Sequence, residues 1–376
     1  MQYRKLAHTK ETVSVLGLGC MRFPTINLDG RDCIDEEEAI RMVRFAIDHG
    51  VNYIDTAWPY HGGESEPLVG RALCDGYRDK VMLATKSPVF SIQKPEEFEE
   101  ILEAQLKKLQ TDHIDFYLMH SLSKNTWENV VLKFGLLDKA VRAKKEGKIR
   151  HIGFSFHDEF PVFQQIADGF DQWEFCQIQL NYADTQNQAG LLGLEYAAAC
   201  GLDVVIMEPL RGGRLAVPPK RVAEHLDTKK SPVEWGLDYL WNRPEVGTVL
   251  SGMSSMEQLV QNIGYAAEGK AGMLTPEENT MLEEAGEIFN KGALVGCTAC
   301  GYCMPCPAGL EIPELFRLYN QTGSGNREQA AEAYAKMNKS AADCLHCRHC
   351  EKDCPQHIEI HAVMDQVNAY FEALAD

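Results

Sequence analysis

Eight of the thirteen cysteines stand in two short runs toward the C-terminal end of the chain. The runs are Cys297-Thr-Ala-Cys300-Gly-Tyr-Cys303-Met-Pro-Cys306-Pro and Cys344-Leu-His-Cys347-Arg-His-Cys350-Glu-Lys-Asp-Cys354-Pro. Three thiolates at two-residue gaps can wrap one iron–sulfur cubane, and a fourth thiolate before a proline completes its ligand set. Two runs of this kind predict two [4Fe–4S] clusters.

The pairing of cysteines with clusters follows from the pattern of two-cluster ferredoxins, in which the fourth cysteine of each run binds the other run's cluster. By that pattern one cluster would be held by Cys297, Cys300, Cys303 and Cys354, and the other by Cys344, Cys347, Cys350 and Cys306. The first run has two residues rather than three before its last cysteine, which leaves this exchange open. Two structural zinc sites, with His346 and His349 as additional ligands, are the alternative; zinc sites normally use separated Cys-x-x-Cys pairs, which favours iron–sulfur.

A second group of titratable residues lies at or just beyond the ends of apolar runs in the first half of the chain: Asp55, Tyr60, Lys86 and His120. A carboxylate, a phenol, an amine and an imidazole can together move a proton and stabilise charge. Each residue alone has a simpler explanation, because an Asp or His at a strand end often caps a helix or binds the backbone. Four of them at or just beyond the ends of three successive strands favour a catalytic site.

The elements that must position these side chains are short strands that alternate with helices up to about residue 255. Eight apolar runs predict strands, at Val15–Gly19, Tyr53–Thr56, Val81–Lys86, Ile114–His120, His151–Ser155, Phe175–Asn181, Val204–Pro209 and Thr248–Gly252. Most runs lack alternation of apolar and polar residues, as expected of parallel strands covered on both faces. Strand then helix, eight times over, predicts an α/β protein with a (β/α)8 TIM barrel, which we assign to residues 1–290; barrel active sites lie at the carboxyl ends of the strands.

A second domain is expected over residues 291–376, because the composition changes after about Asn290. Between the cysteine runs, Ile312–Asn320 and Asn326–Met337 have helical periodicity and are separated by the turn-forming Gly323-Ser-Gly325. This small, mainly α-helical domain resembles the two-cluster ferredoxin modules of respiratory iron–sulfur subunits and heterodisulfide reductases. Metal binding can supply folding energy, so we expect the clusters to stabilise it.

Composition and charge exclude several other classes of protein. The 376 residues include 45% hydrophobic and 24% charged ones, which is ordinary globular usage. The net charge of −18 is the opposite of what a nucleic-acid or anionic-membrane binder needs. No apolar run reaches the roughly 18 residues of a membrane span, and no secretory signal is visible. We therefore expect a cytoplasmic protein without nucleic-acid or membrane partners, whose cysteines serve metal ligation or redox chemistry.

Three segments around the titratable residues, Tyr53–Glu66, Ala84–Lys86 and Ile114–His120, are similar to the aldo/keto reductase family. The resemblance spans roughly residues 1–285. It implies a TIM-barrel oxidoreductase that binds NAD(P)H without a Rossmann fold and acts on a carbonyl or alcohol. It also implies that the family's catalytic tetrad consists here of Asp55, Tyr60, Lys86 and His120.

The residue types of this tetrad suit the reaction that the resemblance implies. Hydride addition to a carbonyl leaves an alkoxide-like oxygen that needs a proton, and a phenol of ordinary pKa about 10 is a poor acid unless its anion is stabilised. Lys86 would place a positive charge beside Tyr60, the general acid/base, and Asp55 would hold that lysine. His120 would donate to the substrate oxygen and orient it.

The resemblance also implies a set of cofactor contacts. Ser155 and Gln177 would bind the carboxamide, the loop from Leu210 through Gly212 would lie along the pyrophosphate, and the adenosine end would be held by Ser254, Gln258 and Asn262. Met207-Glu208 replaces the family's Tyr-Ser, and Phe156 stands where an Asn usually follows the Ser. Basic residues that usually bind the 2′-phosphate are replaced by Gly252, Ser254 and Gln258. NAD and NADP therefore both stay open, with NADH or weak cofactor binding favoured.

Three functions remain in competition. The first is hydride exchange between NAD(P)H and a carbonyl or alcohol, with the clusters serving electron transfer or structure. The second is a reductase to which a ferredoxin or another redox partner delivers single electrons through the clusters; because a hydride carries two electrons, it would need a splitter such as flavin, and no flavin motif is evident. The third is a nicotinamide-binding redox sensor, resembling ion-channel auxiliary subunits built on the same barrel.

Overall fold

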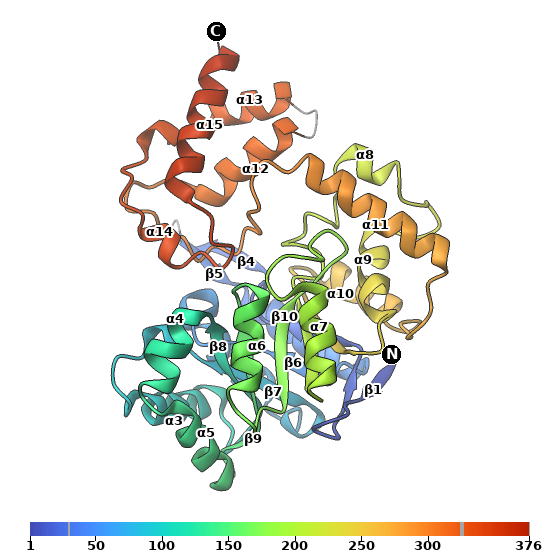
Figure 1. Ribbon diagram of the computed structural model, residues 1–376, viewed down its shortest axis with the longest axis vertical. Coiled ribbons are helices and arrows are strands. Elements are labelled where there is room, and N and C mark those ends of the chain that lie inside the picture. The colour runs from blue at the N-terminus through green and yellow to red at the C-terminus, as the bar shows by residue number, and fades with distance from the viewer. Residues whose placement is uncertain (29–30, 324–326, 376) are drawn as a thin grey trace. The chain divides into compact units, whose positions relative to one another are not determined.

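The computed structural model describes residues 1–28, 31–323 and 327–375 (Figure 1). The chain divides into two compact units. The barrel unit comprises Met1–Pro209 and Leu237–Thr275, and the cysteine-rich unit comprises Leu210–Gly236 and Pro276–Asp376. The predicted domain boundary between residues 290 and 291 stays a prediction. By packing, residues 210–236 and the helix over Pro276–Lys291 group with the cysteine runs.

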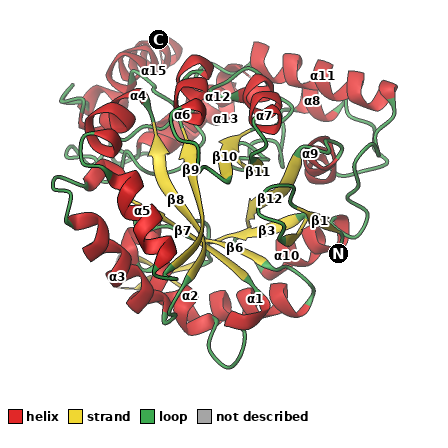
Figure 2. Cartoon of the chain, turned by 60° about the horizontal axis from the view of Figure 1, so that its bottom comes forward, coloured by secondary structure: helices red, strands yellow, loops and turns green. Residues whose placement is uncertain are grey.

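Eight parallel strands close into a barrel, which confirms the predicted TIM-barrel architecture, and Figure 2 shows them in yellow inside a ring of red helices. In order around the barrel they are β3 (Leu16–Gly19), β6 (Tyr53–Asp55), β7 (Met82–Ser87), β8 (Ile114–Leu122), β9 (Ile149–Phe156), β10 (Phe175–Gln179), β11 (Asp203–Met207) and β12 (Val246–Gly252). Every residue of β10 is buried, which is why its sequence shows no alternation.

Two antiparallel hairpins accompany the barrel. The strands β1 (Tyr3–Lys5) and β2 (Thr12–Ser14) form one, and β4 (Thr25–Leu28) and β5 (Arg31–Ile34) form the other. Leu6 and Val13, beside and within the first hairpin, pack into the same apolar cluster as Tyr53, Phe116 and Phe175. The first hairpin therefore contributes to the core inside the barrel.

Helices cover the outside of the barrel. Asp35 caps α1 (Glu36–Asp48) by accepting a hydrogen bond from the backbone N–H of Glu38, and the buried face of α1 includes Ala39, Met42 and Val43. The other helices assigned wholly or partly to this unit are α2 (Ser65–Ala72), α3 (Glu97–Leu109), α4 (Lys124–Thr126), α5 (Leu136–Lys145), α6 (Phe160–Asp168), α7 (Gly190–Ala199), α9 (Pro232–Trp241) and α10 (Met256–Tyr265).

The described part of the cysteine-rich unit is helical and contains no strand, as predicted. Its helices are α8 (Lys220–Ala223), α11 (Pro276–Lys291), α12 (Ile312–Gly323), α13 (Arg327–Ala335), α14 (His349–Lys352) and α15 (Ile360–Ala375). Leu315, Phe316, Met364 and Val367 are at the centre of its small apolar core. Of the turn expected at 323–325, residues 324 and 325 lie outside the described residues.

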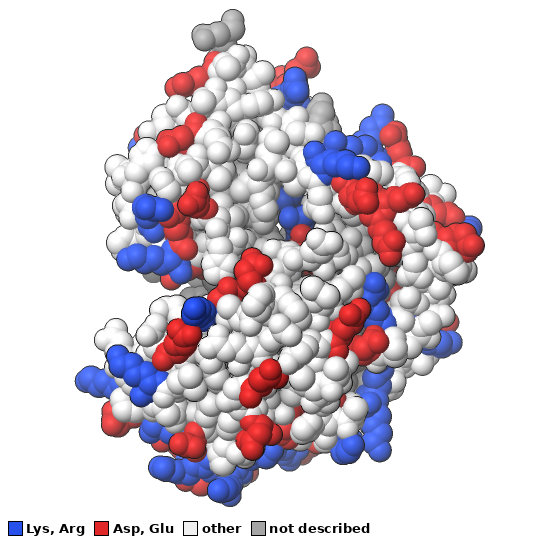
Figure 3. Space-filling model, viewed as in Figure 1, with Lys and Arg blue, Asp and Glu red and all other residues white. Residues whose placement is uncertain are grey.

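Across the described residues, none of the helices has the length and apolar character that a membrane-spanning segment requires. On the face of the molecule seen in Figure 3, acidic and basic side chains are intermixed, so the net charge of −18 is not gathered into one acidic patch there.

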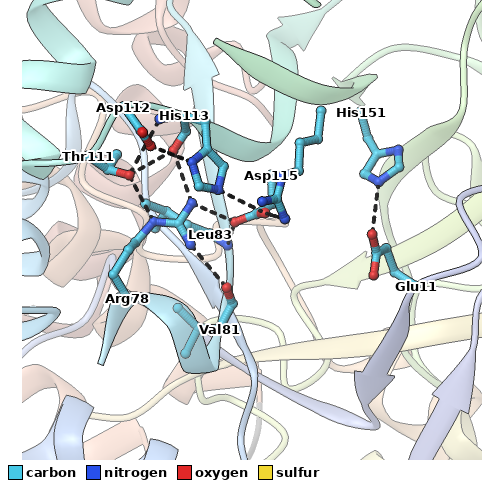
Figure 4. Close-up of polar contacts among 10 residues, drawn as sticks. Glu11, Arg78, Val81, Leu83, Thr111, Asp112, His113, Asp115 and His151 are labelled. Carbon is cyan, nitrogen blue, oxygen red and sulfur yellow. Dashed lines mark hydrogen bonds and ion pairs between the residues drawn. The ribbon is translucent and has the colours of Figure 1, made fainter. Parts of the chain in front are cut away.

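At the start of β8, on the edge of the barrel opposite the carboxyl ends of the strands, a buried carboxylate organises an ion network (Figure 4). The Asp115 side chain is 1% exposed, and its oxygens lie 2.8 Å from both Arg78 Nη2 and Arg150 Nη1. Asp115 also accepts the backbone N–H of Leu83 at 2.9 Å, which ties β8 to β7. The carboxylate thus has the charge partners and donors that its burial requires.

We expect Asp115→Asn to lower the free energy of unfolding of the barrel by about 3 kcal/mol, because removing one partner of a buried ion pair leaves the other uncompensated. Asp112→Asn is the matched control: Asp112 also pairs with a neighbour, His113, at 2.6 Å, but its side chain is 95% exposed, so a change below about 0.5 kcal/mol is expected. Urea titration of both variants measures the difference. Equal losses would contradict this role of Asp115.

Candidate functional site

The four residues predicted to be catalytic lie at the carboxyl edge of three adjacent strands. Asp55 is the last residue of β6, Lys86 lies near the end of β7 and His120 near the end of β8. Tyr60 begins the short helix Tyr60–Gly63 that follows β6. All four side chains are buried. Parallel pairing of β6, β7 and β8 is what brings these separated sequence positions to one edge.

Lys86 is the centre of the site. Its ammonium donates to Asp55 Oδ1 at 2.6 Å, to the backbone carbonyl of Thr56 at 2.9 Å and to the Tyr60 hydroxyl at 3.5 Å. The structure therefore brings three of the four predicted residues into hydrogen-bond contact. Burial raises the pKa of Asp55, and the positive charge of Lys86 opposes that rise.

The His120 ring packs edge-on to Tyr60, with ring centroids 6.2 Å apart, and tilted against Phe90 at 5.4 Å. Burial, together with the charges of Lys86 and His157, lowers the pKa of His120 well below its ordinary value. The imidazole is therefore neutral at physiological pH. Among the described residues its Nδ1 is buried without a hydrogen-bond partner.

A buried polar network behind β7 holds the backbone around Lys86. No pattern in the sequence indicates this network. Gln105 Nε2 donates to the backbone carbonyl of Lys86 at 3.0 Å and to Glu66 Oε1 at 2.6 Å, and Thr85 donates to the same oxygen at 2.7 Å. The Tyr117 hydroxyl donates to Gln105 Oε1 at 2.8 Å. These residues position the lysine without touching its ammonium.

The residues expected to bind the carboxamide of a nicotinamide lie on neighbouring strands of the barrel unit. Ser155 Oγ accepts the backbone N–H of Ser121 at 2.7 Å. Gln177 Nε2 lies 3.6 Å from the sulfur of Met207, whereas its Oε1 is buried without a partner among the described residues. A buried, unpartnered amide oxygen is the acceptor that a carboxamide N–H₂ would satisfy, so this position fits a nicotinamide.

Of the three residues expected at the adenosine end, Ser254 precedes α10, Gln258 lies in its first turn and Asn262 lies one turn further along. Gln258 Oε1 accepts the backbone N–H of Ser254 at 2.8 Å, and Asn262 donates to Ser251 at 3.1 Å. Ser254 Oγ donates to the backbone carbonyl of Arg22 at 2.9 Å. The neighbouring Ser255 caps α10 by accepting the backbone N–H of Gln258.

The loop expected along the pyrophosphate belongs to the cysteine-rich unit, unlike the other predicted cofactor residues. Gly212, which follows Leu210 and Arg211, has φ +62°, and a Cβ there would lie 1.9 Å from the carbonyl oxygen of Thr298. Arg214 Nη1 donates to the backbone carbonyls of Val295 and Cys297, both at 3.4 Å. This loop therefore packs directly on the start of the first cysteine run.

The eight predicted metal ligands line two neighbouring cavities of similar size, about 320 and 380 Å³. The first-run cavity is lined by Cys297, Cys300, Cys303 and Cys354, and the second-run cavity by Cys306, Cys344, Cys347 and Cys350. Each cavity thus combines three cysteines of one run with the last cysteine of the other. The described residues contain no group of three or more His, Cys, Asp or Glu side chains arranged around a single metal ion.

The two cysteine loops share an unusual backbone. Ala299 and His346 occupy the same position of their runs and have φ +53° and +49°; Gly301 and Arg348, two residues later in each run, have φ +82° and +59°. Left-handed conformations at non-glycine residues are costly and concentrate at functional sites. In the first loop the backbone N–H of Ala299 points at Cys297 Sγ, 3.3 Å away.

Two thiols of the cysteine runs have raised pKa values. Burial and the neighbouring cysteines raise the pKa of Cys303 to about 12, and burial raises that of Cys350 to about 11. Gathering thiolates in such a place is costly without a compensating cation. A thiol donor set in a mainly apolar cavity fits the iron atoms of a cluster.

Comparison with known proteins matches both parts of the chain. The model of the aldo/keto reductase family matches residues 15–287, and that of the 4Fe-4S dicluster domain matches residues 293–358. The Bacillus subtilis protein YrpG, described as an uncharacterized oxidoreductase, is 32% identical over 236 residues, covering 57% of this chain and 68% of its own. The holo form of an aldo-keto reductase from Bacillus halodurans superposes with a TM-score of 0.64 at 26% identity, covering 76% of this chain and 96% of its own.

Proposed function

Since the chain belongs to the aldo/keto reductase family, we propose that it transfers hydride between NAD(P)H and a small carbonyl or alcohol substrate, with Tyr60 as the general acid and base. The observation that carries this proposal is the contact of the Lys86 ammonium with both Asp55 and the Tyr60 hydroxyl. Anaerobic oxidation of NADH and NADPH in the presence of a panel of aldehydes and ketones tests it.

The tetrad divides the work of proton transfer. Bound NAD(P)H supplies the hydride that adds to the carbonyl carbon while the C=O π bond opens onto oxygen. The Tyr60 O–H donates its proton to that oxygen, and Lys86, 3.5 Å away, stabilises the phenolate that remains. Asp55 keeps the ammonium in place and compensates its burial. Neutral His120 orients the substrate oxygen, and in alcohol oxidation the same groups work in reverse.

The proposed cofactor contacts follow the family pattern. Ser155 and Gln177 would hold the carboxamide, Leu210 and Gly212 the pyrophosphate, and the adenosine end would rest on Ser254, Gln258 and Asn262. The support is the buried, unpartnered oxygen of Gln177. Because the adenosine segment offers Ser254 and Gln258 where a 2′-phosphate calls for a cation, we propose that NADH is used at least as well as NADPH.

We expect Gln258→Arg to lower KM for NADPH about tenfold, because a charged partner for the 2′-phosphate contributes about 1.4 kcal/mol or more. KM for NADH should stay within about twofold. Gln261→Arg, an exposed position one turn further along α10, is the control for an added charge alone. Steady-state kinetics with both cofactors decide it; an equal change for NADH and NADPH would count against the assignment.

The C-terminal segment contains a 4Fe-4S dicluster domain. We propose that it holds two [4Fe–4S] clusters, one in the first-run cavity and one in the second-run cavity, so that each run supplies its last cysteine to the other run's cluster. The grouping of the cysteines in the two cavities supports this. About eight iron atoms and eight sulfides per chain are expected. Zinc with no acid-labile sulfide would contradict it.

The second candidate function is delivery of electrons through the clusters from a ferredoxin or a similar redox partner. The exposure of the second run favours this function: Cys347 is exposed, whereas the other seven cysteines of the two runs are partly buried. Two clusters that each accept one electron could store two electrons, and combining them into a hydride would still require a two-electron carrier such as flavin. We propose that the protein works in the cytoplasm, where thiols remain reduced and free for cluster ligation.

A further inference from the structure

The two cysteine runs differ in how far they reach the surface. In the second run every residue from Leu345 through His349 is exposed, and Leu345 is 66% exposed. In the first run Thr298 is buried, and the residues from Ala299 through Cys303 are all partly buried. The loop of the second run therefore offers a partner more exposed side chains than the loop of the first run does.

The two cavities are connected by shared walls. Ile312, at the start of α12, and Ile360, at the start of α15, line both the first-run and the second-run cavity. Two clusters in these places would be neighbours separated by aliphatic side chains. The two cavities are therefore adjacent.

Charge distinguishes the two cavities as well. Arg348 and His361 line the second-run cavity, whereas the described lining of the first-run cavity has no ionisable side chain besides its cysteines. Arg348 is 57% exposed and donates to Glu351, whose side chain is only 14% exposed and is also bonded by His361. One largely covered carboxylate therefore faces two basic groups.

The largely exposed loop from Leu345 through Cys350 contains Arg348 and no acidic residue, in a chain of net charge −18. Just beyond it, Lys352 and Asp353 are both exposed and carry opposite charges. Asp365 pairs with His346 at 2.8 Å from α15, and Arg348 remains more than half exposed. Figure 3 shows basic side chains over α14, next to acidic ones. An incoming protein would meet the large apolar side chain of Leu345 on the same loop as the half-exposed cation Arg348.

We propose that this face, made of Leu345, His346, Cys347, Arg348 and Lys352, is the docking surface for a small acidic protein that carries single electrons. The inference rests on the proposed electron-transfer role of the clusters. In the docked complex the reduced carrier loses one electron and the cluster held by Cys306, Cys344, Cys347 and Cys350 gains it, so that its core charge falls from 2+ to 1+ and no bond forms or breaks. Ile312 and Ile360, which line both cavities, would then separate the reduced cluster from the cluster held by the first run.

The physical basis is electrostatic steering. Complexes between electron carriers are small and short-lived, so their rate depends on how often the partners meet in the right orientation. Opposite charges around the contact raise that association rate by about 10 to 10³ at low salt, and the gain falls as salt rises. Arg348 and Lys352 would supply the positive side of this attraction.

The test is stopped-flow reduction of the anaerobic full chain by a reduced plant-type [2Fe–2S] ferredoxin, which is acidic. We expect the double variant Arg348→Glu, Lys352→Glu to lower the second-order rate constant about tenfold or more at low ionic strength. At about 1 M salt, where screening acts over about 3 Å, the variant and the parent protein should approach one another. Lys220→Glu is the control, an 85% exposed lysine of the same unit, and should change the rate less than about twofold.

Each protein is first checked for iron content, its EPR signal and photoreduction by deazaflavin, which needs no docking. Lys352→Glu alone, further from the cysteines, replaces the double variant if that variant loses iron, and about a threefold loss is then expected. Rates equal to the parent's, or an equal loss in Lys220→Glu, would overturn the docking surface. If ferredoxin fails to reduce even the parent protein while deazaflavin succeeds, the docking inference is wrong, whereas Tyr60-dependent hydride transfer stands or falls by its own assay.

Discussion

Replacing Tyr60 by phenylalanine will lower kcat for carbonyl reduction by about 10² to 10⁴-fold, the usual contribution of a general acid. The hydroxyl is the group that meets the Lys86 ammonium at 3.5 Å, and phenylalanine keeps the ring that packs edge-on to His120. Binding of the cofactor should therefore persist while proton donation is lost. Steady-state turnover and direct cofactor titration separate the two effects.

Tyr53→Phe is the matched control for this experiment. Tyr53 is a fully buried tyrosine of the same unit, two residues before Asp55, and its hydroxyl has no hydrogen-bond partner among the described residues. Its loss should leave kcat within about twofold, because no hydrogen bond disappears. If Tyr60→Phe turned over as fast as Tyr53→Phe, the proton would have another donor and the proposed mechanism would be wrong.

A substitution of Tyr60 tests catalysis with less effect on stability than a substitution of Lys86 would have. The Lys86 and Asp55 side chains are 1% and 2% exposed and lie 2.6 Å apart. Removing the ammonium would leave a buried carboxylate without its counter-charge, at a cost of about 3 to 5 kcal/mol in stability. A loss of activity in such a variant would mix catalysis with folding, whereas Tyr60→Phe changes a single hydroxyl.

The barrel could be predicted from the sequence because its strands are buried on both faces, which leaves continuous apolar runs such as the one that becomes β10. The catalytic tetrad could be predicted from the sequence for a related reason. An ionisable residue at the end of an apolar run is conspicuous, and parallel strands carry such ends to one edge. Asp55, Lys86 and His120 all occupy such ends.

The supporting network behind β7 was not predictable in the same way. Glu66 and Gln105 lie on helices, where a polar residue normally faces solvent, yet both are completely buried. Only the packing of α2 and α3 against β7 turns these side chains into partners for Thr85 and the backbone of Lys86. The assignment of residues 210–236 to the cysteine-rich unit is likewise a result of contacts distant in sequence, such as Gly212 with Thr298.

Removal of the iron–sulfur clusters will loosen residues 210–236 together with 276–375, while the barrel keeps its protection. The apolar core of the cysteine-rich unit is small, and six of the predicted cluster ligands pack against it, so bound metal would supply part of its folding energy. Residues 210–236 are held to this unit by contacts such as Arg211 with Asn290 at 3.0 Å and His225 with Glu284 at 3.1 Å. The loosened part should therefore begin far ahead of the cysteine runs in sequence.

Hydrogen exchange read by mass spectrometry, on the anaerobic protein before and after chelator treatment, measures this. Peptides from 210–236 and 276–375 should lose protection about tenfold or more, and peptides from β10 and β11 should stay unchanged. If residues 210–236 kept their protection, they would not depend on the clusters, and loosening would be confined to the segment after Lys291.

Substitutions at two neighbouring glycines test the contact between the 210–236 segment and Thr298 while the clusters stay bound. A Cβ at Gly212 would lie 1.9 Å from the Thr298 carbonyl oxygen, whereas one at Gly213 would meet nothing within 4 Å; both residues have positive φ, +62° and +88°. Gly212→Ala and Gly213→Ala therefore share the backbone strain of about 1 kcal/mol, and only the first adds a backbone clash. We expect Gly212→Ala to expose residues 210–236 with the clusters still bound and to weaken NAD(P)H binding more than Gly213→Ala does. Equal exchange in the two variants would mean that the loop is not held through Thr298.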